Sequence, residues 1–379
     1  MKLRWLLILL VAASGCAVAA SPVLHRNNAD KLPLFEMQEL FESVRIPHII
    51  VARDGSVLAF ARSCRLIRRS ENHGRTWSTV REVGPDVTGS AIVDDNNGDV
   101  LIVCGRGYLY RSQDHGKTRK KEDIVIKPND VGHGTPDGVP VSLGASESGI
   151  TLTAAKHKGR LLMPARIQPP KGDNAQEYWP YNYNTAIYSD HGGRTWQTGG
   201  PLQSGTGERT LAELSDGRIY YNSRCHMAVD HRRRIAWSHD GGHMWTDWQV
   251  SDHLYEVGEP FYFKYGTKPS YGCNAGLVRI PLEANGGRHV LLFSTPDNPG
   301  GDRVSMTVWA SFDGAQTWPA KRLVYGGPSA YSSLAADRDG TVYLLFENGT
   351  KELYERISVA RFNLDWVAGE KDWRDFLTD

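Results

Sequence analysis

The cysteines and histidines set the limits of the metal and redox chemistry that this sequence could perform. After Cys16 the chain has four more cysteines, which are Cys64, Cys104, Cys225 and Cys273. None of them forms a Cys-x-x-Cys pair, so a structural zinc site is not expected. In an exported chain they could form two disulfides or remain buried thiols. His133, in a glycine-rich turn, has no second histidine at metal-ligand spacing, and we predict no required metal or organic cofactor.

Acidic and amide side chains recur in five short segments of the form Ser-x-Asp-x-Gly-x-Thr-Trp, with one or two positions changed in most copies. These boxes are residues 70–77, 112–119, 189–196, 238–245 and 311–318. An Asp or Asn side chain can accept hydrogen bonds from nearby backbone N–H groups, and glycine supplies positive φ. The Trp ring can pack beneath such a turn. We therefore interpret the boxes as structural hairpin turns that lie away from any ligand.

The elements around these turns are predicted to be short strands. Successive boxes begin 42, 77, 49 and 73 residues apart, and two of these intervals match one propeller blade of roughly 40–50 residues. Apolar strand segments follow turns at residues 56–61, 100–103, 160–164, 218–221, 289–293 and 341–346. These six recurrences predict an all-β fold, a six-bladed β-propeller of four-stranded antiparallel sheets.

Composition agrees with a globular β protein. The chain has 379 residues, a formal net charge of +1, 40% hydrophobic residues, and 39 Gly, 11 Trp and 16 Tyr. The charge balance argues against a protein that coats nucleic acid or anionic membranes. The apolar content excludes disorder of the whole chain. Abundant glycine and aromatic residues favour strands joined by tight turns.

The N-terminus resembles an export signal. A basic start, an apolar run and small residues predict a signal peptide over residues 1–20, followed by one domain over residues 21–379. Acylation of Cys16 in a lipoprotein is an alternative. No other long apolar stretch occurs, so we expect a mature protein without a membrane span that is secreted or extracytoplasmic. That location is the periplasm, or the lysosome or extracellular space in a eukaryote.

The boxes and the segments between them resemble the Asp-boxes, or BNR repeats, of sialidases (neuraminidases) from about residue 34 to residue 347. Arg45-Ile46-Pro47 resembles the motif that carries the family's first carboxylate-binding arginine. Residues 208–224 resemble its Glu, Glu-Leu-x-Asp-Gly-Arg and Asn-x-Arg stretch. The resemblance implies a site glutamate at Glu208 and the second arginine at Arg224.

The resemblance also covers the C-terminal third of the chain. Arg303, just before a strand-like segment, fits the third arginine. Tyr331 lies in a segment similar to the Tyr-Ser-x-Leu motif of the nucleophile. Glu347 lies in a segment similar to the Tyr-Glu-x-Gly motif, whose glutamate braces the first arginine.

Together these residues imply a retaining exo-α-sialidase that removes terminal sialic acids from sialylated glycoproteins, glycolipids or oligosaccharides. Planar guanidinium groups suit the carboxylate of a sialic acid. A neutral phenol would not repel that carboxylate as a carboxylate nucleophile would. A tyrosine is a weak nucleophile near neutral pH, and Glu208 is expected to take its proton.

One family feature is missing from the sequence. Sialidases usually carry an acid/base aspartate about two dozen residues after the first arginine, but residues 60–70 contain no acidic residue. Asp54 lies too early and belongs to a turn. Either another residue or water supplies the proton, or the activity is weakened or changed. The gap motivates one alternative, a non-catalytic sialic-acid-binding propeller. A hydrolase of another acidic sugar is a further alternative.

Other charged and aromatic segments have simpler interpretations. Residues 117–121 and 232–234 are rich in Lys and Arg and are predicted to be solvated turns. Residues 177–183 combine aromatic and polar side chains, which could form a sugar-binding rim or fill a surface loop.

Overall fold

The computed structural model describes residues 32–131, 141–144, 147–168, 182–258 and 271–377, which belong to one compact unit beginning at Leu32. The predicted signal peptide and Cys16 lie outside the described residues, as do His133 and most of the 177–183 segment. The described helices are short: α1 (Leu364–Ala368), η2 (Ala155–His157), η5 (Leu282–Asn285) and η6 (Trp373–Phe376). Within the described residues, no helix is long and apolar enough to cross a membrane.

Almost all regular structure is β. Three four-stranded sheets have the simple order that hairpins produce. The first contains β2 (His48–Val51), β3 (Val57–Ala61), β4 (Leu66–Ser70) and β5 (Arg81–Glu82). The second contains β6 (Gly89–Asp94), β7 (Asp99–Cys104), β8 (Tyr108–Ser112) and β9 (Lys120–Asp123). The third contains β16 (Thr206–Glu213), β17 (Ile219–Cys225), β18 (Arg232–Ser238) and β19 (Thr246–Tyr255).

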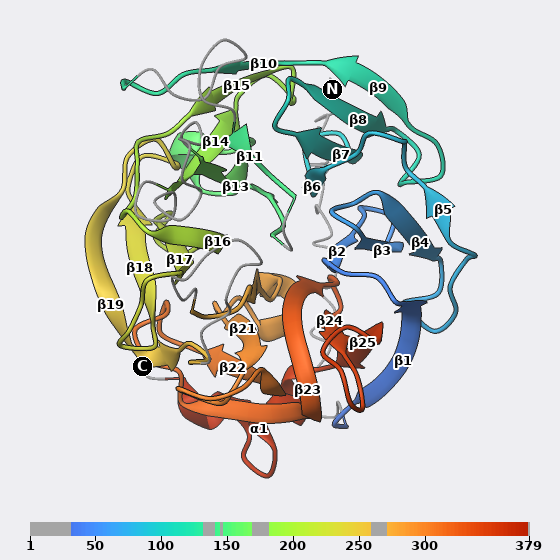
Figure 1. The fold of residues 1–379 in the computed structure, drawn as a ribbon, viewed down its shortest axis with the longest axis vertical. Helices are drawn as coiled ribbons and strands as arrows, with labels where there is room; N and C mark the ends of the chain where they lie inside the picture. Colours follow the sequence, from blue (N-terminus) through green and yellow to red (C-terminus); the bar gives the residue numbers. More distant parts are fainter. Residues whose placement is uncertain (1–31, 132–140, 145–146, 169–181, 259–270, 378–379) are drawn as a thin grey trace, which may run out of the picture. The chain divides into compact units, whose positions relative to one another are not determined.

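Two larger sheets complete the unit. One has six strands: β10 (Val125–Lys127), β11 (Val141–Ser142), β12 (Ile150–Thr151), β13 (Leu161–Ile167), β14 (Tyr183–Ser189) and β15 (Thr195–Thr198). The other has seven: β1 (Phe35–Glu42), β20 (Gly276–Arg279), β21 (Leu291–Pro296), β22 (Val304–Ser311), β23 (Ala320–Ala336), β24 (Val342–Asn348) and β25 (Arg356–Phe362). The sheets follow one another around a common centre, with β2, β6 and β16 near it and β5, β9 and β19 outside (Figure 1).

The all-β fold with a propeller-like arrangement of small sheets is thus confirmed, but two details differ from the expectation. The described strands form five hydrogen-bonded sheets, not six, because the long β23 pairs with β22 along its first half and with β24 along its second half. In addition, not every pair is antiparallel. The β10 strand, at the edge of its sheet, runs parallel to β15.

The apolar core lies between neighbouring sheets. Leu58 and Phe60 of the first sheet pack with Ile102 of the second. The first sheet also packs against the last, since Ile49 lies in one cluster with Leu345. The N-terminal β1 pairs with β25 on that last sheet. These contacts close the ring and bring segments some 300 residues apart in sequence to the same centre.

The boxes are turns, as the sequence analysis proposed. In all five, the Oγ of the first serine accepts a hydrogen bond from the N–H four residues later, at 2.8–3.0 Å. Asp114 and Asp313 likewise each accept from the N–H of the threonine four residues later. In chain order, the boxes lead to β5, β9, β15, β19 and β23. None of the expected site residues comes from a box.

Candidate active site

Two β-bulges present the central side chains of the site. The pairing of β16 with β17 has one extra residue between Thr206 and Arg209, where Glu208 lies beside Arg224. The pairing of β23 with β24 also has one extra residue, between Ser329 and Ser332, and Tyr331 lies in this bulge. A bulge bends its strand and redirects a side chain, and such bulges are frequent next to active sites. Both bulges lie toward the same end of the inner strands.

Tyr331 and Glu208 form the centre of the site. The Tyr331 hydroxyl donates to Glu208 Oε1 at 2.6 Å, and Arg224 Nη1 donates to the other carboxylate oxygen at 2.7 Å. Arg224 Nη1 also lies 3.5 Å from the Tyr331 hydroxyl oxygen. The carboxylate therefore contacts a phenol and a guanidinium at once. In this arrangement the phenol can give its proton directly to Glu208.

Glu347 links the first arginine to this pair. Its two oxygens accept from Arg45 Nε at 3.2 Å and Arg45 Nη2 at 3.3 Å. They also accept from the backbone N–H groups of Ile46 at 2.8 Å and Tyr331 at 3.1 Å. The Glu347 side chain is fully buried, while that of Arg45 is 40% exposed. One buried carboxylate thus fixes both the guanidinium and the backbone of the tyrosine.

The three arginines converge on the face of Tyr331. The guanidinium carbons of Arg45 and Arg303 lie 4.9 and 5.9 Å from its ring centroid. Tyr354 lies against both, with Arg45 3.9 Å from its ring centroid and Arg303 Nη1 donating to its hydroxyl at 3.1 Å. Together with Arg224, these residues surround one tyrosine with three permanent positive charges. Such a cluster can bind a carboxylate.

The charges around the pair shift its pKa values in opposite directions. Burial raises the pKa of Glu208, but the positive charges of Arg224 and Arg166, together with the hydrogen bond from Tyr331, outweigh burial and hold it well below its usual value. Burial, together with the negative charge of Glu208, raises the pKa of Tyr331. The resting state is therefore a neutral phenol that donates to an ionised carboxylate.

Several site residues were missed by sequence reasoning. Besides Tyr354, they include His226, whose Nε2 lies 3.8 Å from Glu208 Oε2 in the buried interior. Gly207 permits this approach, because a Cβ there would lie 1.8 Å from the His226 ring. Arg166 of β13 is the other addition, through its charge on Glu208. Only the position of His226, two residues after Arg224, could have suggested a role from sequence.

The expected acid/base loop is a tight turn. Strands β3 and β4 are joined by residues 62–65, and Arg62, Ser63 and Cys64 all have positive φ. Asp54 lies in the turn between β2 and β3, at the opposite end of β3, and its carboxylate pairs with Arg69 at 3.0 Å. Among the described residues, Glu208 and Glu347 are the only carboxylates hydrogen-bonded to Tyr331 or to Arg45 and Arg224. The described ranges therefore identify no third carboxylate bound to the tyrosine or to these two arginines.

The structure also settles the interpretation of two other groups. All four cysteines of the described chain are buried free thiols, the second of the two alternatives. The interpretation of residues 232–234 as a solvated turn is wrong. These residues begin β18, and Arg233 is fully buried in an ion pair with Glu256.

Among the described residues, no group of three or more His, Cys, Asp or Glu side chains could hold a metal ion.

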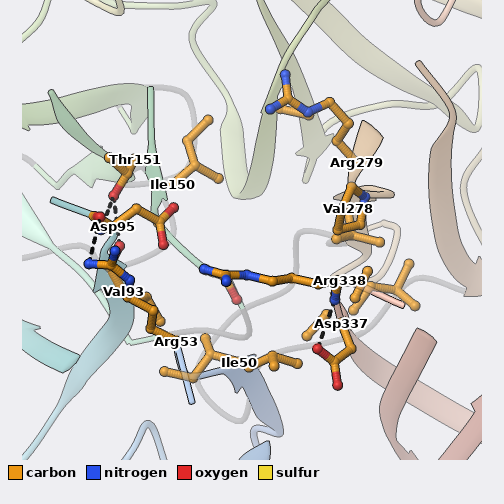
Figure 2. A pocket seen from close by; sticks show the side chains of 18 of the residues that line it. Ile50, Arg53, Val93, Asp95, Ile150, Thr151, Val278, Arg279, Asp337 and Arg338 are labelled. Carbon is orange, nitrogen blue, oxygen red and sulfur yellow. Dashed lines mark hydrogen bonds between the residues drawn. The ribbon is translucent and has the colours of Figure 1, made fainter. Parts of the chain in front are cut away.

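A large cavity lies at the opposite end of the inner strands. It has a volume of about 680 Å³ and is lined by the ends of β2, β6, β16, β20 and β23. The lining residue Arg338 follows Tyr331 by seven residues, which is roughly 20 Å of extended strand. Figure 2 shows the Arg338 side chain extending from beside Asp337 toward Arg53 and Asp95. This far cavity contains none of the expected site residues.

Comparison with known proteins shows which families and proteins this chain is similar to. The BNR repeat-like domain family matches residues 105–344. A sialidase from Micromonospora viridifaciens is 29% identical over 405 residues, which cover 94% of this chain and 58% of that protein. A sialidase from Vibrio cholerae serotype O1 is 30% identical over 214 residues, covering 49% of this chain and 25% of that protein. The chain thus spans less than two thirds of either relative.

A solved structure shares the fold. The Hadza microbial sialidase Hz136 superposes with a TM-score of 0.64 at 21% identity, over 86% of this chain and 66% of that one.

Proposed function

This chain belongs to the BNR repeat-like family that includes the sialidases, and on that premise we propose that it is a retaining exo-α-sialidase. Its substrates would be sialylated glycoproteins, glycolipids or oligosaccharides with a terminal α-linked sialic acid. The observation that carries the proposal is the 2.6 Å contact between Tyr331 and Glu208 among three arginines. A nucleophile in contact with its base is the arrangement that covalent catalysis needs.

The proposed first step forms a bond between Tyr331 Oη and the anomeric carbon. The phenol proton passes to Glu208 Oε1, and the bond from the anomeric carbon to the leaving oxygen breaks. Arg45, Arg224 and Arg303 hold the substrate carboxylate beside the attacked carbon, and Glu347 holds Arg45 in place. Water then hydrolyses the tyrosyl intermediate, so that two inversions give net retention.

The leaving oxygen must also gain a proton. With no third carboxylate at the site in the described chain, water is the proposed donor. Acid–base catalysis contributes roughly 10²–10⁴-fold, so poor leaving groups should suffer most. The tight turn at residues 62–65 also favours a second candidate function, a sialic-acid-binding propeller that does not turn over its ligand.

The remaining features of the proposal concern architecture and location. We propose six blades, because β23 pairs with two groups of strands, and we take β20–β22 and the first half of β23 as the fifth. The second half of β23 with β24, β25 and β1 forms the sixth. We further propose that residues 1–20 direct export and that residues 21–379 act outside the cytoplasm.

A pair of substrates tests the function. The purified protein is incubated with an aryl α-sialoside, which has a good leaving group, and with a natural sialyl oligosaccharide. We expect release of sialic acid from both, faster from the aryl compound, with the α-anomer formed first by NMR. Binding of the oligosaccharide without cleavage of either compound would refute the enzyme and favour the binding protein.

A further inference from the structure

Three arginines donate to three successive backbone carbonyls beneath the site. Arg224 Nε donates to Tyr271 O at 2.5 Å, and Arg303 Nη2 donates to Gly272 O at 2.9 Å. Arg233 Nη1 donates to the next carbonyl, of Cys273, at 2.8 Å. Two of these arginines belong to the proposed carboxylate site, and the third does not. The segment 271–273 is therefore a common support for Arg224 and Arg303.

The support is itself held by a buried ion pair. Arg233 Nη1 lies 2.8 Å from Glu256 Oε1, and the other Glu256 oxygen accepts from the Cys273 N–H at 3.1 Å. Arg233 Nε also donates to Asn222 at 2.7 Å. The side chains of Arg233 and Glu256 are both completely buried. The pair thus binds both the donor and the acceptor side of Cys273.

Gly272 shows how closely the segment follows this carboxylate. Its φ is +77°, and a Cβ there would lie 2.5 Å from Glu256 Oε2. The Gly272 N–H donates to Val257 O at 3.1 Å. The backbone therefore lies directly against Glu256, with no side chain between them.

Stability alone does not explain the pair. A buried ion pair can often be replaced by apolar residues of similar volume without loss of stability. Apolar residues, however, could not hydrogen-bond to the backbone of Cys273. The hydrogen bonds to the support segment are the feature that requires these two side chains.

We propose that Arg233 and Glu256 are positioning residues of the site, which align Arg224 and Arg303 with an anionic ligand through the 271–273 backbone. The inference rests on the proposed function only in taking that ligand to be a sialic-acid carboxylate. Arg224 also contacts Glu208, so the alignment affects both ligand binding and the proton acceptor. A misplacement of about 1 Å can cost as much as 10²-fold in a positioned site.

The experiment compares a carboxylate ligand with its neutral form. An unsaturated sialic acid analogue and its methyl ester are titrated against the full-length protein and against Glu256→Gln, and the ratio of the two Kd values measures carboxylate selectivity. A double variant, Arg233→Met with Glu256→Leu, removes the pair without leaving a buried charge. Asp99→Asn is the matched control, because it breaks the 2.8 Å ion pair with Arg111 in another sheet.

We expect both pair variants to lower the carboxylate selectivity about tenfold, while the control leaves it unchanged. Unchanged selectivity in a folded double variant would overturn the positioning role and leave the proposed function intact. A parent protein that binds the acid no better than the ester would instead refute the proposed function, and the inference with it. Thermal unfolding of each variant, read by circular dichroism, shows that the comparison is made on folded protein.

Discussion

The two ends of the inner strands each gather three arginines, but they hold them differently. At the site end, Arg224 is almost completely buried, and both Arg224 and Arg303 are bound to backbone carbonyls. Around the far cavity, Arg279 is also bound, to the Glu213 carbonyl at 3.1 Å and the Glu213 carboxylate at 3.4 Å, but Arg53 and Arg338 are exposed. Arg53 makes one long contact, 3.5 Å to Asp95 O, and the Arg338 guanidinium makes no hydrogen bond among the described residues.

The carboxylates differ in the same way. At the site end, Glu347 and Glu208 are buried and bind both arginines and functional groups of the site. Around the far cavity, Glu213 is also buried and pairs with Arg279, whereas Asp95 is exposed. What marks the site end is that its three arginines and its buried carboxylates are all fixed around one tyrosine before a ligand arrives.

The largest expected effect is the loss of kcat when the hydroxyl group of Tyr331 is removed from the site end. Tyr331→Phe should lower kcat for an aryl sialoside about 10³-fold, because the nucleophilic oxygen is lost while the ring remains. Binding of the sialic acid analogue should largely survive. The control is Tyr343→Phe, at a buried tyrosine of the neighbouring strand β24, and it should leave kcat unchanged. Turnover by Tyr331→Phe at the parent rate would remove Tyr331 from the mechanism.

Matched arginine substitutions test the comparison itself. Arg303→Met should weaken binding of the carboxylate ligand about 10- to 100-fold, the loss expected for one charge-assisted contact. Arg338→Met should leave the Kd within about twofold, because its guanidinium is not held by the far cavity. Isothermal titration of both variants measures the difference. Equal losses would show that the far cavity contributes to ligand binding.

The pH profile tests the charge of Glu208. Because Arg224 helps to hold the pKa of Glu208 well below its usual value, the acid limb of kcat/KM should lie below pH 4.5. Arg224→Met should raise that pKa and move the limb to higher pH. The same linkage makes ionised Glu208 stabilising above its unfolded pKa, a contribution lost as pH falls through the lower folded pKa. An identical acid limb in both proteins would contradict this assignment.

The smallest effect on function is expected at a box. Asp313→Ala removes the acceptor for the Thr317 N–H and hydroxyl, at a cost of about 1 kcal/mol of unfolding free energy. Urea denaturation should detect that loss, while kcat/KM stays at the parent value. A large drop in kcat/KM for the folded variant would show that the box does more than form a turn.

The sequence predicted the parts of this molecule that depend on local pattern. The boxes became turns because their serine and acidic side chains bond to N–H groups four residues away. Glu208 and Arg224 were assigned from the family resemblance, and the single hairpin that joins β16 to β17 brings them side by side. The number of separate sheets could not be predicted, since nothing local indicates that β23 continues from one strand group to the next.

The residues that were missed depend on contacts between distant segments. Tyr354 lies between Arg45 and Arg303, which come from the two ends of the chain. The run Arg232-Arg233-Arg234 resembles solvated charge, yet strand alternation turns Arg233 alone into the buried interior. Its partner Glu256 is 23 residues away, and no periodic pattern links the two.

The central claim is that the site end holds a tyrosine nucleophile beside a preformed carboxylate site. The most direct measurement is mass spectrometry of the protein after incubation with 2,3-difluorosialic acid. The fluorine at C3 of this compound slows hydrolysis of a covalent intermediate. We predict a sialosyl adduct on the peptide that contains Tyr331, and no adduct in Tyr331→Phe. An adduct on another residue, or rapid turnover of an aryl sialoside with inversion at the anomeric carbon, would contradict the account.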